Sequence, residues 1–294
     1  MTTAREGAAL VALLGLGRRP WHQYADLVES AGSAVSTLQQ ELADPDGQTS
    51  LLPEDPEPAI GHALTEIERW RADGIRLVTM LDHDYPDNLR AVHDRPPLIF
   101  VAGRLEPADR RSVAVVGARR ASRKGLARAR EIAEHLVSSG YAVASGLAAG
   151  IDTAAHGAAL SAGGRTLAVI GTGLAHSYPP ENTALQRRIA RQCAVISQFW
   201  PDSPPSRQSF PMRNAVMSGL TLGTVLVEAS PTSGARLQAR LALSHGRPVF
   251  LVESLLSQSW ARELAARPGT HVIDSPAQIT AAIERLDSPG ALVG

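Results

Sequence analysis

Residues 112–152 read SVAVVGARRASRKGLARAREIAEHLVSSGYAVASGLAAGID, and this stretch decides the fold of the chain. An apolar run, Val113–Val116, ends in Gly117 and is followed by apolar residues at helical three- and four-residue steps. A second apolar run, Tyr141–Ala144, then meets Gly146. The order strand, glycine turn, helix, strand is the unit of a parallel sheet with a right-handed crossover. In such sheets ligands bind beyond the carboxyl ends of the strands.

The first glycine turn is a candidate anion site. A backbone without a β-carbon lets a phosphate approach Gly117 closely, and the helix that follows offers free N–H groups at its start. Four cations come directly after this glycine: Arg119, Arg120, Arg123 and Lys124. The alternative is a tight turn followed by solvated cations. Because cations at a helix N-terminus oppose the helix dipole, we favour an anion as their partner.

The rest of the chain continues the alternation of strands and helices. Helical patterns run over 152–162, 185–191, 213–220, 235–244 and 276–286, and apolar runs predict strands at 75–80, 98–101, 166–170, 194–197, 224–227, 248–252 and 271–273. This alternation predicts an α/β fold with a doubly wound, mostly parallel, Rossmann-like sheet. The strand at 166–170 ends in Gly171-Thr172-Gly173, so Gly146, Gly171 and Gly173 join Gly117 as candidate site glycines. None of these turns forms the dinucleotide fingerprint, and no cofactor is expected.

The N-terminal region differs from the rest. Residues 1–72 predict a small helical domain, and within it residues 43–58 are rich in proline and acid, which is typical of a linker. We therefore expect two domains, 1–72 and 73–294.

Composition limits the function classes. The 294 residues carry a formal net charge of zero, so any nucleic-acid site has to be a local basic cluster. Cys193 is the single cysteine, which excludes a disulfide framework and favours a buried, inert thiol. The sequence shows no membrane span and no signal peptide, so a cytoplasmic protein is expected. His156 and Asp152 share a helix face without a third ligand nearby; we expect no metal site, and we assign Asp152 as the helix N-cap.

The segment FPMRNAVMSGL, residues 210–220, is the most informative later motif. Phe210 is suited to stack on a base, at about 1–3 kcal/mol per base, and Arg213 is suited to hold a phosphate. In the alternative, Phe210 fills the core and Arg213 pairs with Glu228. The chemistry of the residues leaves both possibilities open.

Six stretches together resemble one known family. They are YPDNLRAVHDRPPLIFVAG (85–103), VAVVGARRASRKG (113–125), SGLAAGIDTAAH (145–156), LAVIGTGLAHSYPPEN (167–182), FPMRNAVMSGL (210–220) and VLVEASPTSG (225–234). In this order they are similar to the DprA family, also called Smf, of bacterial DNA-processing proteins. The resemblance covers roughly residues 75–253, and the set is far more specific than any one motif.

This resemblance implies an extended Rossmann fold that binds single-stranded DNA. It implies protection of incoming strands in natural transformation, loading of the RecA recombinase, self-association as a dimer and no enzymatic activity. The implied DNA pocket falls on Gly117, Arg119 and Lys124, with Phe210, Arg213 and Asn214 on its other side. With the flanking Arg120 and the strand-end glycines, these residues form the candidate DNA-binding set; no catalytic residue is assigned.

The chain departs from the family pattern at several points. Ala149 and Ala215 stand where the family often carries basic residues, Ser197–Trp200 replaces a glutamate-proline segment, and little of the pattern remains after Glu253. We expect no winged helix after Leu286. An alternative function is that of a nucleotide sensor or a phosphoribohydrolase-like enzyme of the same fold, with a defence system as one setting for it. For the enzyme, Glu228 is the nearest catalytic candidate, but a PGGxGT-type loop is missing.

Overall fold

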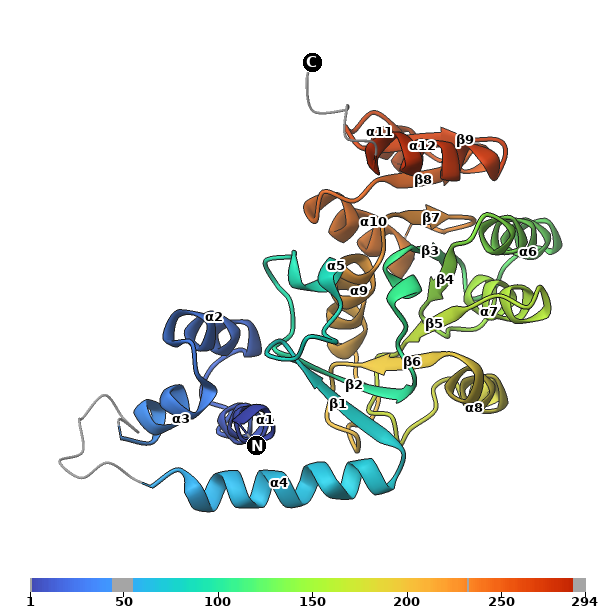
Figure 1. The fold of residues 1–294 in the computed structure, drawn as a ribbon. Coiled ribbons are helices and arrows are strands. Elements are labelled where there is room, and N and C mark those ends of the chain that lie inside the picture. The colour runs from blue at the N-terminus through green and yellow to red at the C-terminus, as the bar shows by residue number, and fades with distance from the viewer. Residues whose placement is uncertain (1, 44–54, 232, 288–294) are drawn as a thin grey trace. The chain divides into compact units, whose positions relative to one another are not determined.

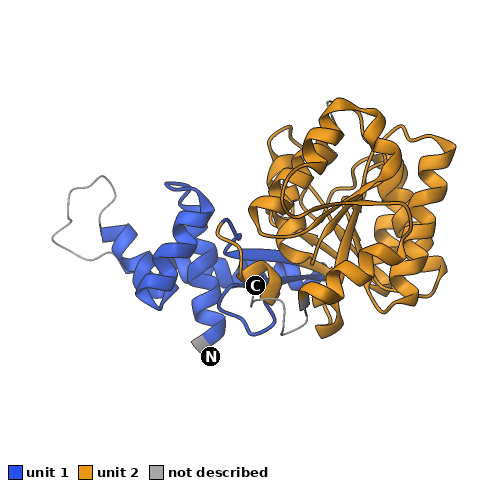
Figure 2. Ribbon diagram, turned by 90° about the horizontal axis from the view of Figure 1, so that it is seen from above, with its two compact units in different colours: residues 1–85, 94–100 blue, residues 86–93, 101–294 orange. Residues whose placement is uncertain are grey.

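The computed structural model describes residues 2–43, 55–231 and 233–287, which divide into two compact units (Figure 2). Unit 1 comprises residues 1–85 and 94–100, and unit 2 comprises residues 86–93 and 101–294. The acidic linker was predicted at residues 43–58, and residues 44–54 of it lie outside the described residues.

Unit 1 is mainly helical, as the N-terminal sequence predicts. Its helices are α1 (Thr2–Gly15), α2 (Trp21–Ala31), α3 (Ala34–Ala43) and α4 (Glu57–Ala72). It also holds strand β1 (Ile75–Thr79) and the start of β2 (Leu98–Gly103). The carboxylate of Glu6 accepts hydrogen bonds from Ser33 Oγ (2.8 Å) and from the backbone N–H groups of Ala34 (2.6 Å) and Val35 (3.2 Å). This contact from α1 satisfies free N–H groups at the start of α3.

Unit 2 is built on seven parallel strands (Figure 1). In chain order they are β3 (Ser112–Val116), β4 (Ala142–Ser145), β5 (Thr166–Val169), β6 (Ala194–Ser197), β7 (Thr224–Leu226), β8 (Val249–Val252) and β9 (Thr270–Ile273). Their order across the sheet is β6-β5-β4-β3-β7-β8-β9. The chain therefore winds outward from β3 in both directions, and the gap between the β3 and β7 ends is the topological switch point at which such sheets bind ligands.

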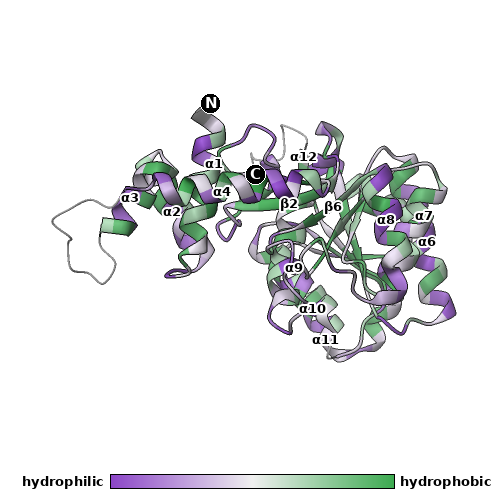
Figure 3. Cartoon of the chain, turned by 90° about the horizontal axis from the view of Figure 1, so that it is seen from below, coloured by the Kyte–Doolittle hydropathy of each residue, from purple (hydrophilic) through white to green (hydrophobic). Residues whose placement is uncertain are grey.

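Helices cover both faces of this sheet (Figure 1). They are α5 (Asp87–Arg90), α6 (Arg123–Ser138), α7 (Ile151–Ser161), α8 (Thr183–Gln192), α9 (Ser209–Leu220), α10 (Gly234–Ser244), α11 (Ser259–Ala265) and α12 (Ala277–Asp287), with single 3₁₀ turns at Pro107–Arg110, Pro180–Asn182 and Glu253–Ser257. Val113 and Val115 pack under α6, α7 and α12 in one core cluster, whereas Val116, on the opposite pleat, lines a cavity bordered by α9 and α10. The strands are accordingly the apolar centre of the unit in Figure 3.

All nine predicted strands are present, with ends that shift by one or two residues, so the predicted fold class is confirmed. The short helices α5 and α11 were not predicted. Cys193 is buried with a free thiol, as expected. No helix among the described residues is both long enough and apolar enough to cross a membrane.

The N-cap assignment of Asp152 is wrong. Helix α7 starts at Ile151, one residue earlier than predicted, and Gly150 takes the N-cap position with φ of 80°. The Asp152 carboxylate turns back and accepts hydrogen bonds from the N–H groups of Gly146 (3.1 Å) and Ala148 (3.3 Å). Asp152 thus orders the loop after β4 instead of capping its own helix.

His156 is a core residue of α7 with no solvent exposure. Its Nδ1 lies 2.6 Å from Thr166 Oγ1, and that hydroxyl donates its only proton to the carbonyl of Val143 (2.7 Å). The Nδ1 atom must therefore donate to Thr166, which fixes the tautomer of a neutral ring. Burial lowers the pKa of His156 to about 3.

We expect His156 to make the protein sensitive to acid. Above pH 6.5 the imidazole is neutral in both folded and unfolded states. Below pH 6.5 only the unfolded state takes up the proton, until the pH reaches about 3, the folded-state pKa of His156. The free energy of unfolding should fall by about 1.4 kcal/mol per pH unit over this range.

The measurement is urea unfolding of the wild type and His156→Gln between pH 7 and pH 4.5. Glutamine keeps an N–H donor for Thr166 but does not titrate, and both proteins share all other titrating groups. The stability advantage of the wild type should shrink as the pH falls. Parallel pH profiles for the two proteins would contradict the assignment.

Candidate functional site

A buried arginine ties helix α9 to the sheet edge. Arg213 is only 7% exposed, and its Nη1 donates to the carbonyls of Gly146 (2.5 Å) and Val169 (2.6 Å) at the ends of β4 and β5. Its Nε donates to Asn214 Oδ1 (3.0 Å), and Nη2 has no hydrogen-bond partner among the residues that the structure describes. The predicted alternative, a pair between Arg213 and Glu228, is wrong.

Burial lowers the pKa of Arg213 to about 10, an effect that the nearby Asp152 carboxylate opposes. A pKa of about 10 still leaves the guanidinium charged at neutral pH. The same burial raises the pKa of Asp152, which Arg213 and the two loop N–H groups oppose. The site therefore contains a fixed, poorly solvated positive charge whose free Nη2 donor can meet an anion.

Phe210 lies one helical turn before Arg213, so both side chains share one face of α9. Its ring is half-buried. The guanidinium carbon of Arg119 lies 5.5 Å from the ring centroid, and the Tyr178 ring lies at 5.5 Å with an interplanar angle of 45°. The α9 helix starts at Ser209, so Phe210 lies inside the helix and not before it as predicted.

Two adjoining cavities share the side chains of Arg119, Phe210 and Arg213. The larger, of about 490 Å³, extends between the loop after β3 and the start of α10. The smaller, of about 200 Å³, extends toward Ala149 and Tyr178. The shared side chains therefore form a wall with a concave surface on either side, at the carboxyl ends of the strands.

The cavities bring together seven of the ten predicted site residues: Gly117, Arg119, Arg120, Gly146, Phe210, Arg213 and Asn214. Arg119 and Arg120 are exposed, and neither is ion-paired within the described part of the chain. Lys124 is exposed on the first turn of α6 and lines neither cavity. Gly171 and Gly173 also lie outside both linings, and their binding of DNA stays a prediction.

Three of these glycines make room for protein atoms. A β-carbon at Gly146 would lie 2.5 Å from Arg213 Nη1, and one at Gly171 would lie 2.8 Å from the Phe210 ring. One at Gly173 would lie 2.1 Å from the carbonyl oxygen of Pro201. Two of them thus let α9 hold its arginine and its phenylalanine close to the strand ends, and the third lets two loops pack.

One part of the predicted anion site, the N-cap of α6, is engaged by a carboxylate of the chain itself. The Glu228 carboxylate accepts hydrogen bonds from Ser122 N (3.0 Å) and Ser122 Oγ (2.6 Å) at the N-cap of α6. A β-carbon at Gly125 would lie 2.1 Å from Glu228 Oε2, so the carboxylate sits directly against the first turn. The N-cap residue of α6 is thus engaged by an intramolecular carboxylate, and anion binding by Gly117, Arg119 and Lys124 stays a prediction.

Sequence reasoning missed Tyr178, Gln238 and the residues that start α10. Tyr178 is 39% exposed and lines the smaller cavity, whereas Gln238 is buried and lines the larger one. Tyr178 lies within the motif at 167–182, and the motif at 225–234 and the predicted helix 235–244 meet at the start of α10, so these segments were marked; nothing local marks Gln238 as a site residue.

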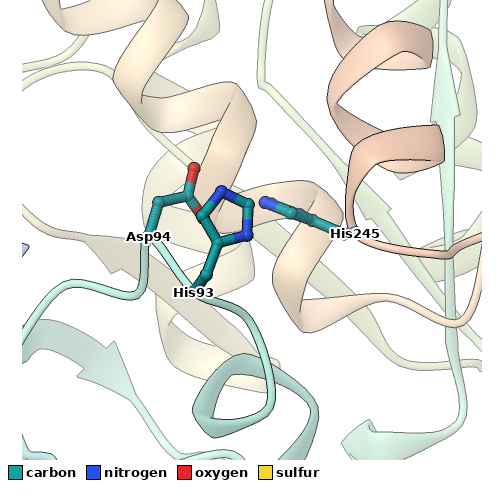
Figure 4. A group of neighbouring side chains, drawn as sticks. All are labelled: His93, Asp94 and His245. Carbon is teal, nitrogen blue, oxygen red and sulfur yellow. The ribbon is translucent and has the colours of Figure 1, made fainter.

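His93 and His245 form a separate pair in unit 2 (Figure 4). Their ring centroids are 5.5 Å apart in an edge-to-face arrangement, and His245 Nδ1 lies 2.7 Å from Ser218 Oγ. Figure 4 also shows Asp94, the next residue in the chain after His93. Neither histidine lines the two cavities, so this pair takes no part in the candidate site.

Comparison with known proteins identifies the family. Residues 76–286 match the family described as DNA recombination-mediator protein A. The chain belongs to this family. It is 40% identical over 174 residues to the DNA processing protein DprA of Streptococcus pneumoniae, a match that covers 59% of this chain and 61% of that relative. The matched segments span 45–65% of the lengths of the curated relatives.

Solved DprA structures share the fold. The X-ray structure of DprA from Streptococcus pneumoniae superposes with a TM-score of 0.73 at 29% identity, covering 94% of this chain and 97% of that one. DNA processing protein A from Helicobacter pylori superposes with a TM-score of 0.62 at 24% identity, covering 71% and 96%. The description of the latter structure concerns its mode of binding single-stranded DNA. The DprA resemblance read from the sequence motifs is confirmed.

We expect Gly171→Ala to destabilise this DprA-family chain through the Phe210 ring. The added methyl group would overlap the ring, and overpacking of this kind costs about 1–3 kcal/mol of unfolding free energy. The measurement is chemical denaturation of Gly171→Ala, Phe210→Ala and the double variant. The double variant should recover most of the loss caused by Gly171→Ala, because the clash is then gone.

Gly157→Ala in α7 is the matched control. Nothing lies within 4 Å of a β-carbon built there, so this change should be neutral or stabilising by up to about 1 kcal/mol. Additive effects of Gly171→Ala and Phe210→Ala would show that the ring does not occupy this position.

Proposed function

We propose that the chain binds single-stranded DNA with little sequence preference at the carboxyl edge of the unit 2 sheet. The observation that carries the proposal is the half-buried Phe210 ring, flanked by Arg119 and Tyr178 and backed by the charged Arg213. A base stacks on any aromatic face, and arginines contact the phosphate on either side, so the arrangement suits a strand of any sequence.

The larger biological role follows from the family. Relatives named DNA processing protein DprA, and a DprA structure described as binding single-stranded DNA, support a role in DNA processing. We extend the proposal to protection of incoming DNA in the cytoplasm during natural transformation, to loading of the RecA recombinase and to action as a homodimer. These steps rest on family resemblance.

We further propose that the chain acts by binding and not as an enzyme. Glu228, the nearest catalytic candidate, has both carboxylate oxygens engaged by Ser122 at the N-cap of α6. Glu228 also lines neither cavity, which counts against its use in ribosyl-bond cleavage by the phosphoribohydrolase-like alternative.

Arg119→Gln should weaken binding to single strands of every sequence, because it removes one phosphate contact. The plot of log K against log salt concentration should lose about 0.7 from its slope. The measurement is fluorescence anisotropy with a labelled thirty-nucleotide strand at several salt concentrations. Phe210→Leu should weaken binding with little change of slope, since stacking releases no counterions.

The control is Arg130→Gln, an equal change of charge at an exposed position of α6 away from the cavities. It should leave affinity and slope nearly unchanged. Equal losses in Arg119→Gln and Arg130→Gln would mean that only the overall charge matters, and would count against the site.

Ala149→Lys should strengthen binding. Ala149 lines the smaller cavity beside Arg119 and Phe210, at a position where the family often carries a cation. A lysine there adds a phosphate contact without removing any protein contact, so affinity should rise and the salt slope should steepen by about 0.7. An unchanged slope in the same anisotropy assay would mean that the strand does not pass over the smaller cavity.

A further inference from the structure

The histidine pair outside the candidate site belongs to a group of three metal-ligating side chains. His93, Asp94 and His245 each offer one nitrogen or oxygen atom, and these three atoms lie within 4.8 Å of one another (Figure 4). His93 and Asp94 are consecutive residues, so only two segments of the chain have to meet. Among the described residues, no other three histidine, cysteine, aspartate or glutamate side chains come together in this way.

The hydrogen bonds of Ser218 set the tautomer of His245. The buried Ser218 hydroxyl donates its only proton to the carbonyl of Ala215 (3.1 Å), and its oxygen lies 2.7 Å from His245 Nδ1. Because that proton is already used, Nδ1 must carry a hydrogen and donate to the hydroxyl oxygen. Nε2 of the neutral ring is then the nitrogen whose lone pair can bind a metal ion. Histidine ligands of metals are commonly oriented by such a bond from their other ring nitrogen.

The position of His245 also suits a cation. It is the C-cap residue of α10, where the carbonyl groups of the last helical turn carry a partial negative charge. His245 is half-buried and held by Ser218, whereas His93 is exposed and able to turn. Ligand atoms around a tetrahedral zinc ion lie about 3.4 Å apart, given Zn–N bonds of about 2.0–2.1 Å. A rotation of the His93 side chain is therefore enough to bring the ligand atoms to bonding distance.

We propose that His93, Asp94 and His245 bind a zinc ion. Two imidazole nitrogens and one carboxylate oxygen supply three ligands, and water takes the fourth position. Sequence reasoning considered only Asp152 and His156 as ligands and predicted no metal site. Spacing along the chain gives no sign of this group, because residues 93–94 and residue 245 are far apart in the sequence.

The donor set favours zinc over the alkaline-earth ions. Imidazole nitrogen is a good ligand for zinc and neighbouring transition metals, whereas Mg²⁺ and Ca²⁺ prefer sites built of oxygen. Within unit 2 the ion joins the segment after α5, which carries His93, to the end of α10, which carries His245. The unfolded chain does not hold these two residues together, so zinc should bind the folded state and stabilise it.

The test is isothermal titration of the metal-free full chain with Zn²⁺. His93→Gln and His245→Gln, which each remove one imidazole ligand, should weaken zinc binding by at least tenfold, and so should Asp94→Asn. Saturating Zn²⁺ should raise the melting temperature of the wild type and leave that of His93→Gln nearly unchanged. Co²⁺ in place of Zn²⁺ should give a visible absorption band in the wild type that is lost in His93→Gln.

Two further variants test the orientation of His245 and control for other histidines. Ser218→Ala keeps all three ligands but removes the acceptor for His245 Nδ1, so zinc affinity should fall by about 10–100-fold. His62→Gln changes an exposed histidine of α4 outside the group and should bind zinc like the wild type. Thermal melts without metal show which variants are folded, and the exposed position of His93 makes its variant the safest of the set.

The outcomes separate this proposal from the function proposed above. Equal zinc affinity of the wild type and of folded His93→Gln would overturn the zinc site, and so would Mg²⁺ binding as tight as that of Zn²⁺. Neither histidine lines the two cavities, so His93→Gln should bind single-stranded DNA like the wild type. A loss of zinc binding alone therefore supports the metal site without bearing on the DNA site.

Discussion

The bonds from Arg213 to the carbonyls of Gly146 and Val169 are the contact on which the site depends. They join α9 to the ends of two neighbouring strands, and a buried arginine loses much stabilisation when its acceptors move. Because Phe210 lies on the same helix face, the position of the ring is fixed by the position of the arginine. The glycines at 146 and 171 follow from this constraint, since any side chain there would displace the guanidinium or the ring.

Helices α6 and α10 both start beside the switch point, and their N-termini are capped in different ways. Glu228 comes directly after β7, and its carboxylate accepts hydrogen bonds from Ser122 at the N-cap of α6. Helix α6 follows β3, the strand next to β7, so a residue at the end of one strand caps the helix that follows the neighbouring strand. This intramolecular anion fixes the loop carrying Arg119 and Arg120 and leaves their guanidinium groups unpaired within the described residues. The start of α10 is capped by its own Ser233 instead, whose side chain accepts a hydrogen bond from Ala235 N.

The sequence predicted the sheet well because buried parallel strands are short apolar runs with glycine at their ends. It also located Phe210, Arg213 and Arg119, since motif and chemistry coincide there. It failed for single contacts between distant positions: Glu228 with Ser122, Asp152 with Gly146, and Tyr178 with Phe210. Each depends on which strand ends are adjacent, and a periodic pattern along one segment carries no such information.

A net charge of zero is compatible with a phosphate site because the charges are separated within unit 2. Arg119 and Arg120 extend into solvent beside the cavities, while Arg213 supplies its charge from a buried position that water screens poorly. Arg120 lines the larger cavity only, whereas Arg119 and Arg213 line both cavities. The positive charge is therefore concentrated at the larger cavity, because the smaller one also has Glu181 in its lining.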